Sequence, residues 1–182
     1  MAVKTFGSEI LTSSDTNTYL ANSGLVYVTS TTIGSGVSSV TLSSCFNSTY
    51  DAYKIVVAGG TTSTDANMAL RLGASTTGYY SSKLLLFYAT NVTFFVCDNN
   101  AASWTQASYA IGAGTGLNMN VDLQNPFLAK YTYMNGYINA ATVGGPQSGV
   151  HQVATSYNSI TITPSAGTMT GGTVTVYGYR LG

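Results

Sequence analysis

The feature that most constrains this chain is a succession of short segments rich in β-branched and aromatic residues. About ten or eleven such segments follow one another after residue 24, each bounded by glycine, asparagine, serine or proline. In residues 117–123, apolar and polar side chains alternate, which is typical of an antiparallel strand with one wetted face. No repeat of fixed period links the segments, which argues against a propeller or a solenoid. The sequence therefore predicts an all-β protein, an antiparallel β-sandwich.

Turn residues set the ends of the predicted strands. Two glycines close the strand at 53–60, and residues 75–82 are predicted to form a turn that carries two tyrosines. The final strand follows a Gly-Gly turn and runs almost to the last residue, although chain ends are usually loose unless a sheet holds them. The remaining predicted strands cover residues 25–31, 40–44, 68–73, 83–89, 92–97, 106–112, 117–123, 131–140, 150–157 and 159–164.

The clearest helix signal lies near the N-terminus, at residues 12–24. Serines that can cap a helix and an aspartate suited to its first turn precede a short apolar face, and a glycine can end it. A helix of about two turns is marginal alone, so its apolar side chains should dock on another surface. These side chains are Leu11, Tyr19 and Leu20. We expect an N-terminal attachment arm at 1–30 and one β-sandwich domain at 31–182.

The scarcity of charge limits the partners of this chain. Only 7% of its residues are charged, and 6 basic side chains balance 6 acidic ones. Binding of nucleic acid or of an anionic membrane surface needs a basic field, which is absent here. The N-terminal residues lack the apolar core of a secretory signal, and no apolar run approaches the ~18 residues that span a bilayer. A net charge near zero favours association into an assembly.

The two cysteines, Cys45 and Cys97, are too few for a disulfide framework. Each stands beside an apolar segment that contains phenylalanine, so both are predicted to be small buried hydrophobes. A disulfide between them is the alternative.

No catalytic set emerges from the sequence. His151 is the only histidine, and its surroundings lack the nucleophile turn and oriented acid of a triad, so we expect a satisfied or surface histidine. A glycosidase needs two carboxylates about 5 to 9 Å apart; Asp65 and Asp98 stand in predicted loops, but nothing singles them out. Residues 98–100 give only a weak calcium signal. We therefore expect a protein without catalytic residues, metal or cofactor.

The aromatic residues offer a more specific hypothesis. The chain has 14 tyrosines, 6 phenylalanines and 1 tryptophan. Four of them flank predicted loops that also carry asparagine and aspartate, and ring faces beside such polar groups suit a glycan. The alternative is that these rings fill the sheet and subunit contacts. The candidate glycan contacts are Tyr79, Tyr80, Trp104 and Tyr109.

The chain resembles small virion structural proteins of tailed bacteriophages, of the tail-fibre and capsid-decoration type. Residues 6–22 are similar to the arm that begins many such proteins. Residues 29–60, 117–132 and 159–182 carry the rest of the resemblance, and 76–110 match least. The resemblance implies a jelly-roll-like β-sandwich, often trimeric, on the exterior of a particle assembled in the host cytoplasm.

Three functions follow from these observations. The first is a tail-fibre or receptor-binding protein, attached to other virion proteins by its arm and displaying a contact for a host surface glycan. The second is a capsid decoration protein, of cement or head-fibre type, that braces or decorates the shell. The third is a carbohydrate-active enzyme, which the scarce carboxylates disfavour. We expect no nucleic-acid partner and no membrane insertion.

Overall fold

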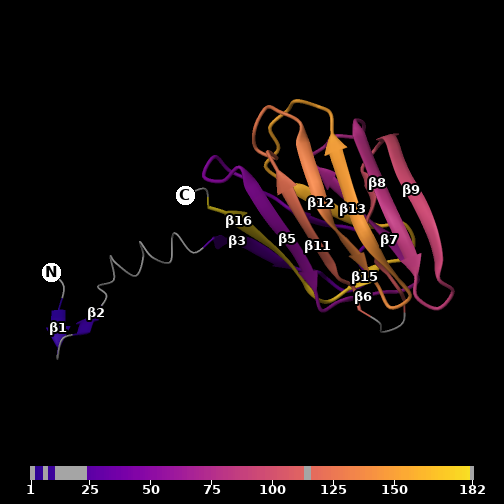
Figure 1. Cartoon of the computed structure of the whole chain (residues 1–182), viewed down its shortest axis with the longest axis horizontal. Helices are drawn as coiled ribbons and strands as arrows, with labels where there is room; N and C mark the ends of the chain where they lie inside the picture. The colour runs from indigo at the N-terminus through magenta and orange to yellow at the C-terminus, as the bar shows by residue number, and fades with distance from the viewer. Residues whose placement is uncertain (1–2, 6–7, 11–23, 113–115, 181–182) are drawn as a thin grey trace.

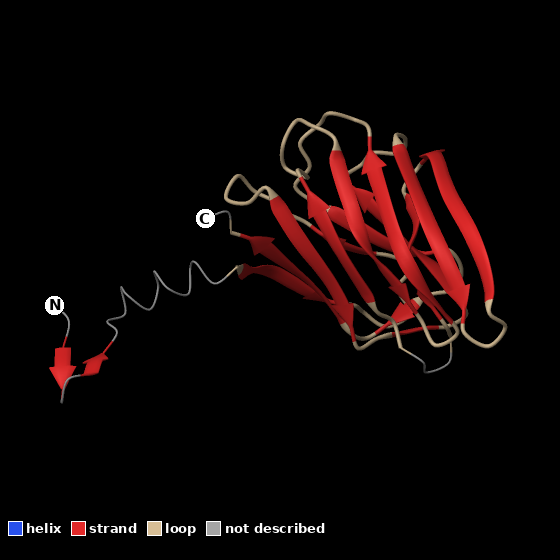
Figure 2. Ribbon diagram, in the orientation of Figure 1, coloured by secondary structure: helices blue, strands red, loops and turns tan. Residues whose placement is uncertain are grey.

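A computed structural model describes residues 3–5, 8–10, 24–112 and 116–180. These residues form antiparallel β-sheets and contain no helix, which confirms the all-β prediction (Figures 1 and 2). The helix predicted at 12–24, with its docking residues Leu11, Tyr19 and Leu20, lies outside the described residues except for Gly24.

The larger sheet has eight strands in the order β3-β16-β5-β11-β12-β13-β8-β9. Each strand pairs antiparallel with its neighbours. The strands are β3 (Leu25–Thr32), β5 (Ala52–Ala58), β8 (Tyr79–Phe87), β9 (Val92–Ala101), β11 (Met119–Gln124), β12 (Thr132–Asn139), β13 (Val143–His151) and β16 (Thr173–Tyr179).

The smaller sheet has four strands in the order β10-β7-β14-β4. They are β4 (Val40–Leu42), β7 (Ala66–Leu72), β10 (Trp104–Ala110) and β14 (Ile160–Pro164). Two short pairs complete the described strands: β6 (Thr61–Thr62) with β15 (Met169–Thr170), and β1 (Val3–Thr5) with β2 (Ser8–Ile10).

One apolar core joins the two sheets. The larger sheet contributes side chains such as Ile55, Val121 and Val176, and the smaller sheet contributes Leu70 and Ile162, all of them 0% exposed. In β7, every second residue is buried, as expected for a strand with one face on a core. Each such side chain stabilises the fold by about 1.5 to 3 kcal/mol on burial, so this shared core is the main source of stability.

A second, smaller cluster lies at the β8–β9 end of the larger sheet. Its buried members are Leu85, Ile138 and Val143. Phe94 of β9 packs edge to face on Phe87 at 5.6 Å between ring centroids and is 52% exposed. The cluster is therefore only partly closed on the β9 side.

The last strand, β16, lies inside the larger sheet, between β3 and β5, and not at its edge. The ring of Tyr50 lies against Gly178, where a Cβ atom would come within 2.4 Å of it. Tyr50 in turn contacts the buried ring of Tyr53. Pairing on both sides explains why a strand so near the end of the chain is ordered.

Two strand predictions were wrong. Residues 75–82 are not all turn, because β8 begins at Tyr79, whose ring packs against Trp104 in the core. The strand predicted at 150–157 is instead β13, which ends at His151. Its glycine-rich sequence has weak strand propensity, and its pairing with both β12 and β8 imposes the extended conformation.

The strand predicted at 25–31 is β3, which begins at Leu25, within the range 1–30 that the prediction assigned to the arm. Cys45 is buried as expected, but Cys97 is exposed on β9, so its predicted burial was wrong. Both thiols are free, and no disulfide joins them.

Val176→Asp tests how far the fold depends on the shared core. The substitution places a carboxylate among apolar side chains without a partner, and we expect the free energy of unfolding to fall by about 3 to 5 kcal/mol. Urea unfolding followed by circular dichroism measures this loss. Thr175→Asp is the control, because the side chain of Thr175 is half-buried on the other face of the same strand. Equal losses in the two variants would contradict the assignment of the two faces.

Candidate functional site

The outer face of the larger sheet, defined as the side chains that point away from the smaller sheet, carries the candidate site. The strand register aligns these side chains in rows that cross the strands. One row crosses all eight strands and consists of Tyr27, Tyr177, Lys54, Asp122, Asn135, Ser148, Ser82 and Cys97. Every member of this row is half-buried or exposed.

Small polar side chains occupy the part of this row that crosses β12, β13 and β8. Asn135, Ser148 and Ser82 lie side by side, and the two serine hydroxyls are 3.3 Å apart. These short side chains form a low, uncharged floor of hydroxyl and amide groups.

Taller side chains stand on both sides of the floor. On one side, Tyr133 and Tyr80 flank Val150 across the three strands. On the other side, Tyr137 pairs with Pro146. The Cα atoms of residues four apart on one strand are separated by about 13 Å. Tyr133 and Tyr137 therefore border a groove that is wide enough to hold one extended chain molecule. We call this feature the tyrosine groove.

Two hollows along the tyrosine groove share Ser82 and Ser148. The first, of about 430 Å³, includes Tyr80 and Tyr133 and opens towards Gln124. The second, of about 270 Å³, lies beside Pro146, Leu84 and Phe95 and reaches β9. The groove thus runs across the strands rather than along them.

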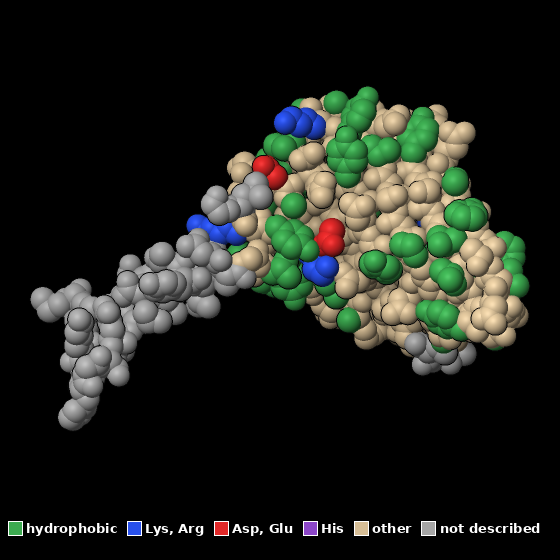
Figure 3. All heavy atoms as spheres, viewed as in Figure 1, with side chains coloured by type: hydrophobic (Ala, Val, Ile, Leu, Met, Phe, Trp, Pro, Cys, Tyr) green, Lys and Arg blue, Asp and Glu red, His purple; other side chains and the backbone are tan. Residues whose placement is uncertain are grey.

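The β11 end of the groove carries the charges of this face. Lys54 Nζ lies 3.2 Å from Asp122 Oδ1, and the Tyr179 hydroxyl donates to the same oxygen at 2.6 Å. Desolvation and the nearby Asp122 carboxylate raise the pKa of Tyr179 to about 12, so the phenol stays protonated. In Figure 3, the charged side chains lie over the half of the face that extends from β3 to β11 and its neighbouring loop, while apolar and uncharged ones cover the β8 and β9 end.

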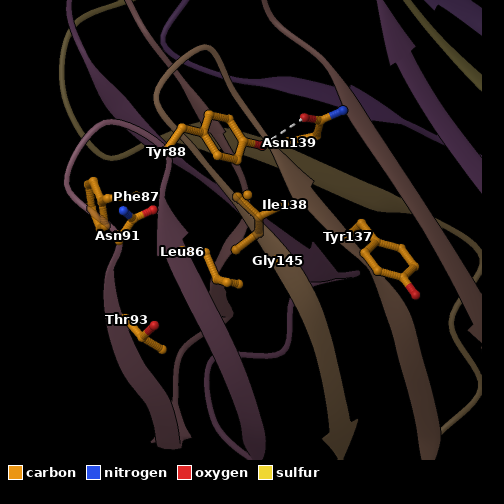
Figure 4. A pocket seen from close by; sticks show the side chains of 10 residues that line it. Leu86, Phe87, Tyr88, Asn91, Thr93, Tyr137, Ile138, Asn139 and Gly145 are labelled. Carbon is orange, nitrogen blue, oxygen red and sulfur yellow. Dashed lines mark hydrogen bonds between the residues drawn. The ribbon is translucent and has the colours of Figure 1, made fainter.

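A larger hollow, of about 580 Å³, lies next to the groove near the turn between β8 and β9. Figure 4 shows Tyr88 lying across β13 towards Asn139, whose side-chain oxygen is 3.4 Å from the Tyr88 hydroxyl. A Cβ atom on Gly144 would meet that hydroxyl at 2.1 Å, so the glycine makes room for the ring. Tyr137 stands at the β12 side of this hollow, and it pairs with Pro146, which lines the second hollow of the tyrosine groove.

The structure separates the four predicted glycan contacts. Only Tyr80 lies in the tyrosine groove. Tyr79 and Trp104 are 0% exposed in the core, where the Tyr79 hydroxyl bonds to the backbone of Leu72. Tyr109 packs against the second cluster. Burial therefore removes Tyr79 and Trp104 from the set of surface contacts, because the loops expected around them are strands.

Sequence reasoning missed Tyr133 and Tyr137, although a signal was present. From residue 131 to 139 every odd position is tyrosine or asparagine, whereas the even positions are threonine, methionine, glycine and isoleucine. Such alternation places all the aromatic and amide side chains of this stretch on one face of β12. The aromatic residues that border the groove on β12 were thus predictable from a single strand, although its floor was not.

His151 is a core residue. Its ring is 0% exposed and packs on Tyr79 and Tyr157, with ring centroids 4.2 and 5.3 Å away. Nε2 lies 3.1 Å from the carbonyl of Thr77, which only accepts, so Nε2 carries the proton and is not a free base for Ser75, 2.9 Å away. Burial lowers the pKa of His151.

A buried ion pair crosses the inner face of β8 and β9. Lys83 Nζ lies 2.9 Å from Asp98 Oδ2, and their side chains are 0% and 4% exposed. Burial raises the pKa of Asp98, but hydrogen bonds from Ser81, Thr105 and Lys83 outweigh burial and hold the pKa below its usual value. The carboxylate is fully engaged, which suits a structural role.

Within the described ranges, no three His, Cys, Asp or Glu side chains come close enough together to hold a metal ion. The described part of the chain also has no helix long and apolar enough to cross a membrane. No protein-family profile matches the chain, and neither the curated proteins nor the solved structures include a match. Function is therefore inferred from the residues themselves.

The burial of His151 predicts acid sensitivity. Because the folded pKa is lowered, the unfolded chain binds the proton first, and stability falls as the pH drops below about 6.5. The slope approaches about 1.4 kcal/mol per pH unit. Urea unfolding between pH 5 and 8 measures it. His151→Phe should remove this slope, because the chain has no other histidine; an unchanged slope would assign it to another group.

Lys83→Met tests the buried pair. Leaving Asp98 without its cation should lower the free energy of unfolding by about 3 to 5 kcal/mol. The double variant Lys83→Met/Asp98→Asn should lose less, because it leaves no unpaired charge. Thermal and urea unfolding compare the two. A double variant less stable than the single one would show that the carboxylate has other essential partners.

Proposed function

We propose that this chain is an exterior structural protein of a tailed-bacteriophage particle, of the tail-fibre or receptor-binding type, which holds a neutral host-surface glycan in the tyrosine groove. The observation that carries the binding role is the groove itself, in which exposed rings border an uncharged floor. The virion assignment rests on the resemblance of residues 6–22, 29–60, 117–132 and 159–182.

The chemistry of the groove suits a neutral sugar chain. Tyr133 and Tyr137 are 44% and 68% exposed, so their ring faces are free to stack on the apolar faces of sugar rings. The hydroxyls of Ser82 and Ser148 and the amide of Asn135 both donate and accept hydrogen bonds, as sugar hydroxyls require. No charged side chain lines the part of the groove between β12 and β9 except the buried Lys83.

The proposed architecture is a jelly-roll-like β-sandwich with an N-terminal attachment arm. Its support is the path of the chain, which passes directly from one sheet to the other at β3–β4, β4–β5, β7–β8, β9–β10, β10–β11 and β13–β14. It passes by way of β6 from β5 to β7, and by way of β15 from β14 to β16. We propose that Leu11, Tyr19 and Leu20 of the arm attach it to other virion proteins, and that the copies assemble as a trimer. Deleting residues 2–24 should then leave a folded protein that no longer joins the particle.

The second candidate function is capsid decoration. It is favoured by the exposed apolar side chains at the β9 edge, among them Phe95 at 82%, which suit packing against a protein surface. The position of the protein on intact particles, seen by cryo-electron microscopy, separates a tail protein from a head protein. An enzymatic role has no support in the described side chains.

Binding to a panel of neutral oligosaccharides and to polysaccharide purified from host cells tests the groove. We expect Tyr133→Ala and Tyr137→Ala each to weaken binding about tenfold, because each truncation removes a stacking surface whose burial contributes about 25 cal/mol per Å² of apolar area. Isothermal calorimetry measures the affinities.

Tyr27→Ala is the matched control. Tyr27 is a 60% exposed tyrosine on the same face, but it stands on β3, at the far end of the row. Wild-type affinity in the two groove variants, or an equal loss in all three, would contradict the proposed site. If none of the sugars tested binds, the proposed ligand of the groove is wrong, and the capsid-decoration function is favoured instead.

A further inference from the structure

The strand β9 is an open edge of the larger sheet. It ends the strand order, and among the described residues it pairs only with β8. Between Val92 and Asp98 its register with β8 is unbroken, and the irregularity comes only beyond Asp98. A regular stretch of this length presents a row of backbone groups to which another strand can bond.

Two common protections of an edge strand are missing from β9, because its sequence, VTFFVCDNNA, has neither proline nor lysine. Its inward-pointing charge, Asp98, and its irregular pairing with β8 both lie at the far end of the strand. Inward charges and bulges also protect sheet edges, so they cover that end of β9. Residues 92–97 have no such protection and remain open to a partner strand.

Apolar side chains flank the edge on both faces of the sheet. Phe95 points to the outer face and is 82% exposed, while Phe94 points to the inner face and is 52% exposed. A molecule lying on one face would cover one ring and leave the other in water. An added strand would place side chains against both rings while bonding to the backbone.

The charge and the area of this region fit a second copy of the chain. The exposed parts of Val92, Phe94, Phe95 and Leu86 present roughly 400 Å² of surface. With the backbone of the edge, this suits a weak dimer, whose interface is smaller than the ~800 Å² per partner of a standard one. The edge is uncharged, so a copy of itself meets no repulsion, and an antiparallel strand pairs with its own copy about a two-fold axis.

The opposite edge, β3, is less suitable. Its pairing with β16 contains a bulge between Val176 and Tyr177, which increases local twist and disfavours strand addition. Its exposed side chains include serine and threonine, and the Tyr27 hydroxyl bonds to Ser30.

We infer that two copies of this chain join edge to edge, β9 against β9, so that their larger sheets form one continuous sheet. The inference goes beyond the proposed function and does not depend on it. Together with the proposed trimer it gives trimers joined in pairs through β9, which is an assembly of dimers and not an isolated trimer. In such a dimer the tyrosine groove of one copy, which reaches Phe95 on β9, meets the groove of the other. A single ligand chain could then contact both copies.

Analytical ultracentrifugation of the full-length chain tests this interface. We expect a dimer, or an assembly of dimers, at micromolar concentration. Phe94→Lys should raise the dissociation constant about thirtyfold or more, because it places a charge in the centre of the contact. Phe94 lies on the face opposite the tyrosine groove, so glycan binding by each copy should persist, which separates failure of the interface from failure of the proposed function.

Tyr27→Lys is the control, because it places the same charge on the β3 edge. Thermal unfolding confirms that both variants remain folded. If Phe94→Lys does not, Val92→Lys replaces it, because Val92 is 41% exposed and lies on the same face of β9 as Phe94. A wild-type monomer, an isolated trimer, or dissociation by Tyr27→Lys alone would overturn the inference.

Cysteine cross-linking identifies the register. In a Cys97→Ser background, single cysteines are introduced in turn from 92 to 99, while Cys45 stays buried. In an antiparallel pair related by a two-fold axis, one residue of β9 lies directly opposite the same residue of the other copy. The yield of disulfide-linked dimers should therefore be highest when the cysteine stands at that position. Native Cys97 serves as the cysteine for position 97 of the series. A dimer without any such peak would contradict pairing through β9.

Discussion

The register of the eight-stranded sheet is the constraint on which the other features depend. A slip of one residue at any strand would exchange the buried and exposed side chains of that strand. Val121 and Val176 would leave the core, and Asn120 or Thr175 would enter it. The same register aligns Asn135, Ser148 and Ser82 into one floor and sets Tyr133 beside Val150 and Tyr80. The core and the candidate site are thus two faces of one hydrogen-bonded arrangement.

Buried polar groups make this arrangement specific. The Lys83–Asp98 pair lies where β8 and β9 approach the edge strand of the smaller sheet, and Asp98 also accepts a hydrogen bond from the Thr105 backbone N–H. An ion pair of this kind adds little net stability over a well-packed apolar pair. It does require Asp98 to meet both β8 and β10, so it favours one placement of the strands over others.

The class of the fold was predictable from the sequence, whereas the surface was predictable only in part. Alternation in residues such as 117–123 gave the strands and their buried sides, because period-two patterns follow directly from strand geometry. β13 was misplaced because its glycines carry no such pattern and its conformation comes from its neighbours. Tyr79 and Trp104 were assigned to the surface because each lies beside a predicted loop. The local sequence around such a residue does not show whether its ring faces water or a second sheet. The groove needed the pairing of distant strands, which no local pattern supplies.

The place of β16 in the sheet has a consequence for the order in which the chain folds. β3 is synthesised before the other strands of its sheet, yet among the described strands it pairs only with β16, joining Leu25 to Tyr179 across most of the sequence. Until β16 emerges from the ribosome, β3 has no partner and β5 remains an edge. Contacts so distant in sequence close slowly, because the entropy of the long loop must be lost first. The growing chain therefore holds an incomplete sheet until β16 has been made, and this single late strand completes the sheet.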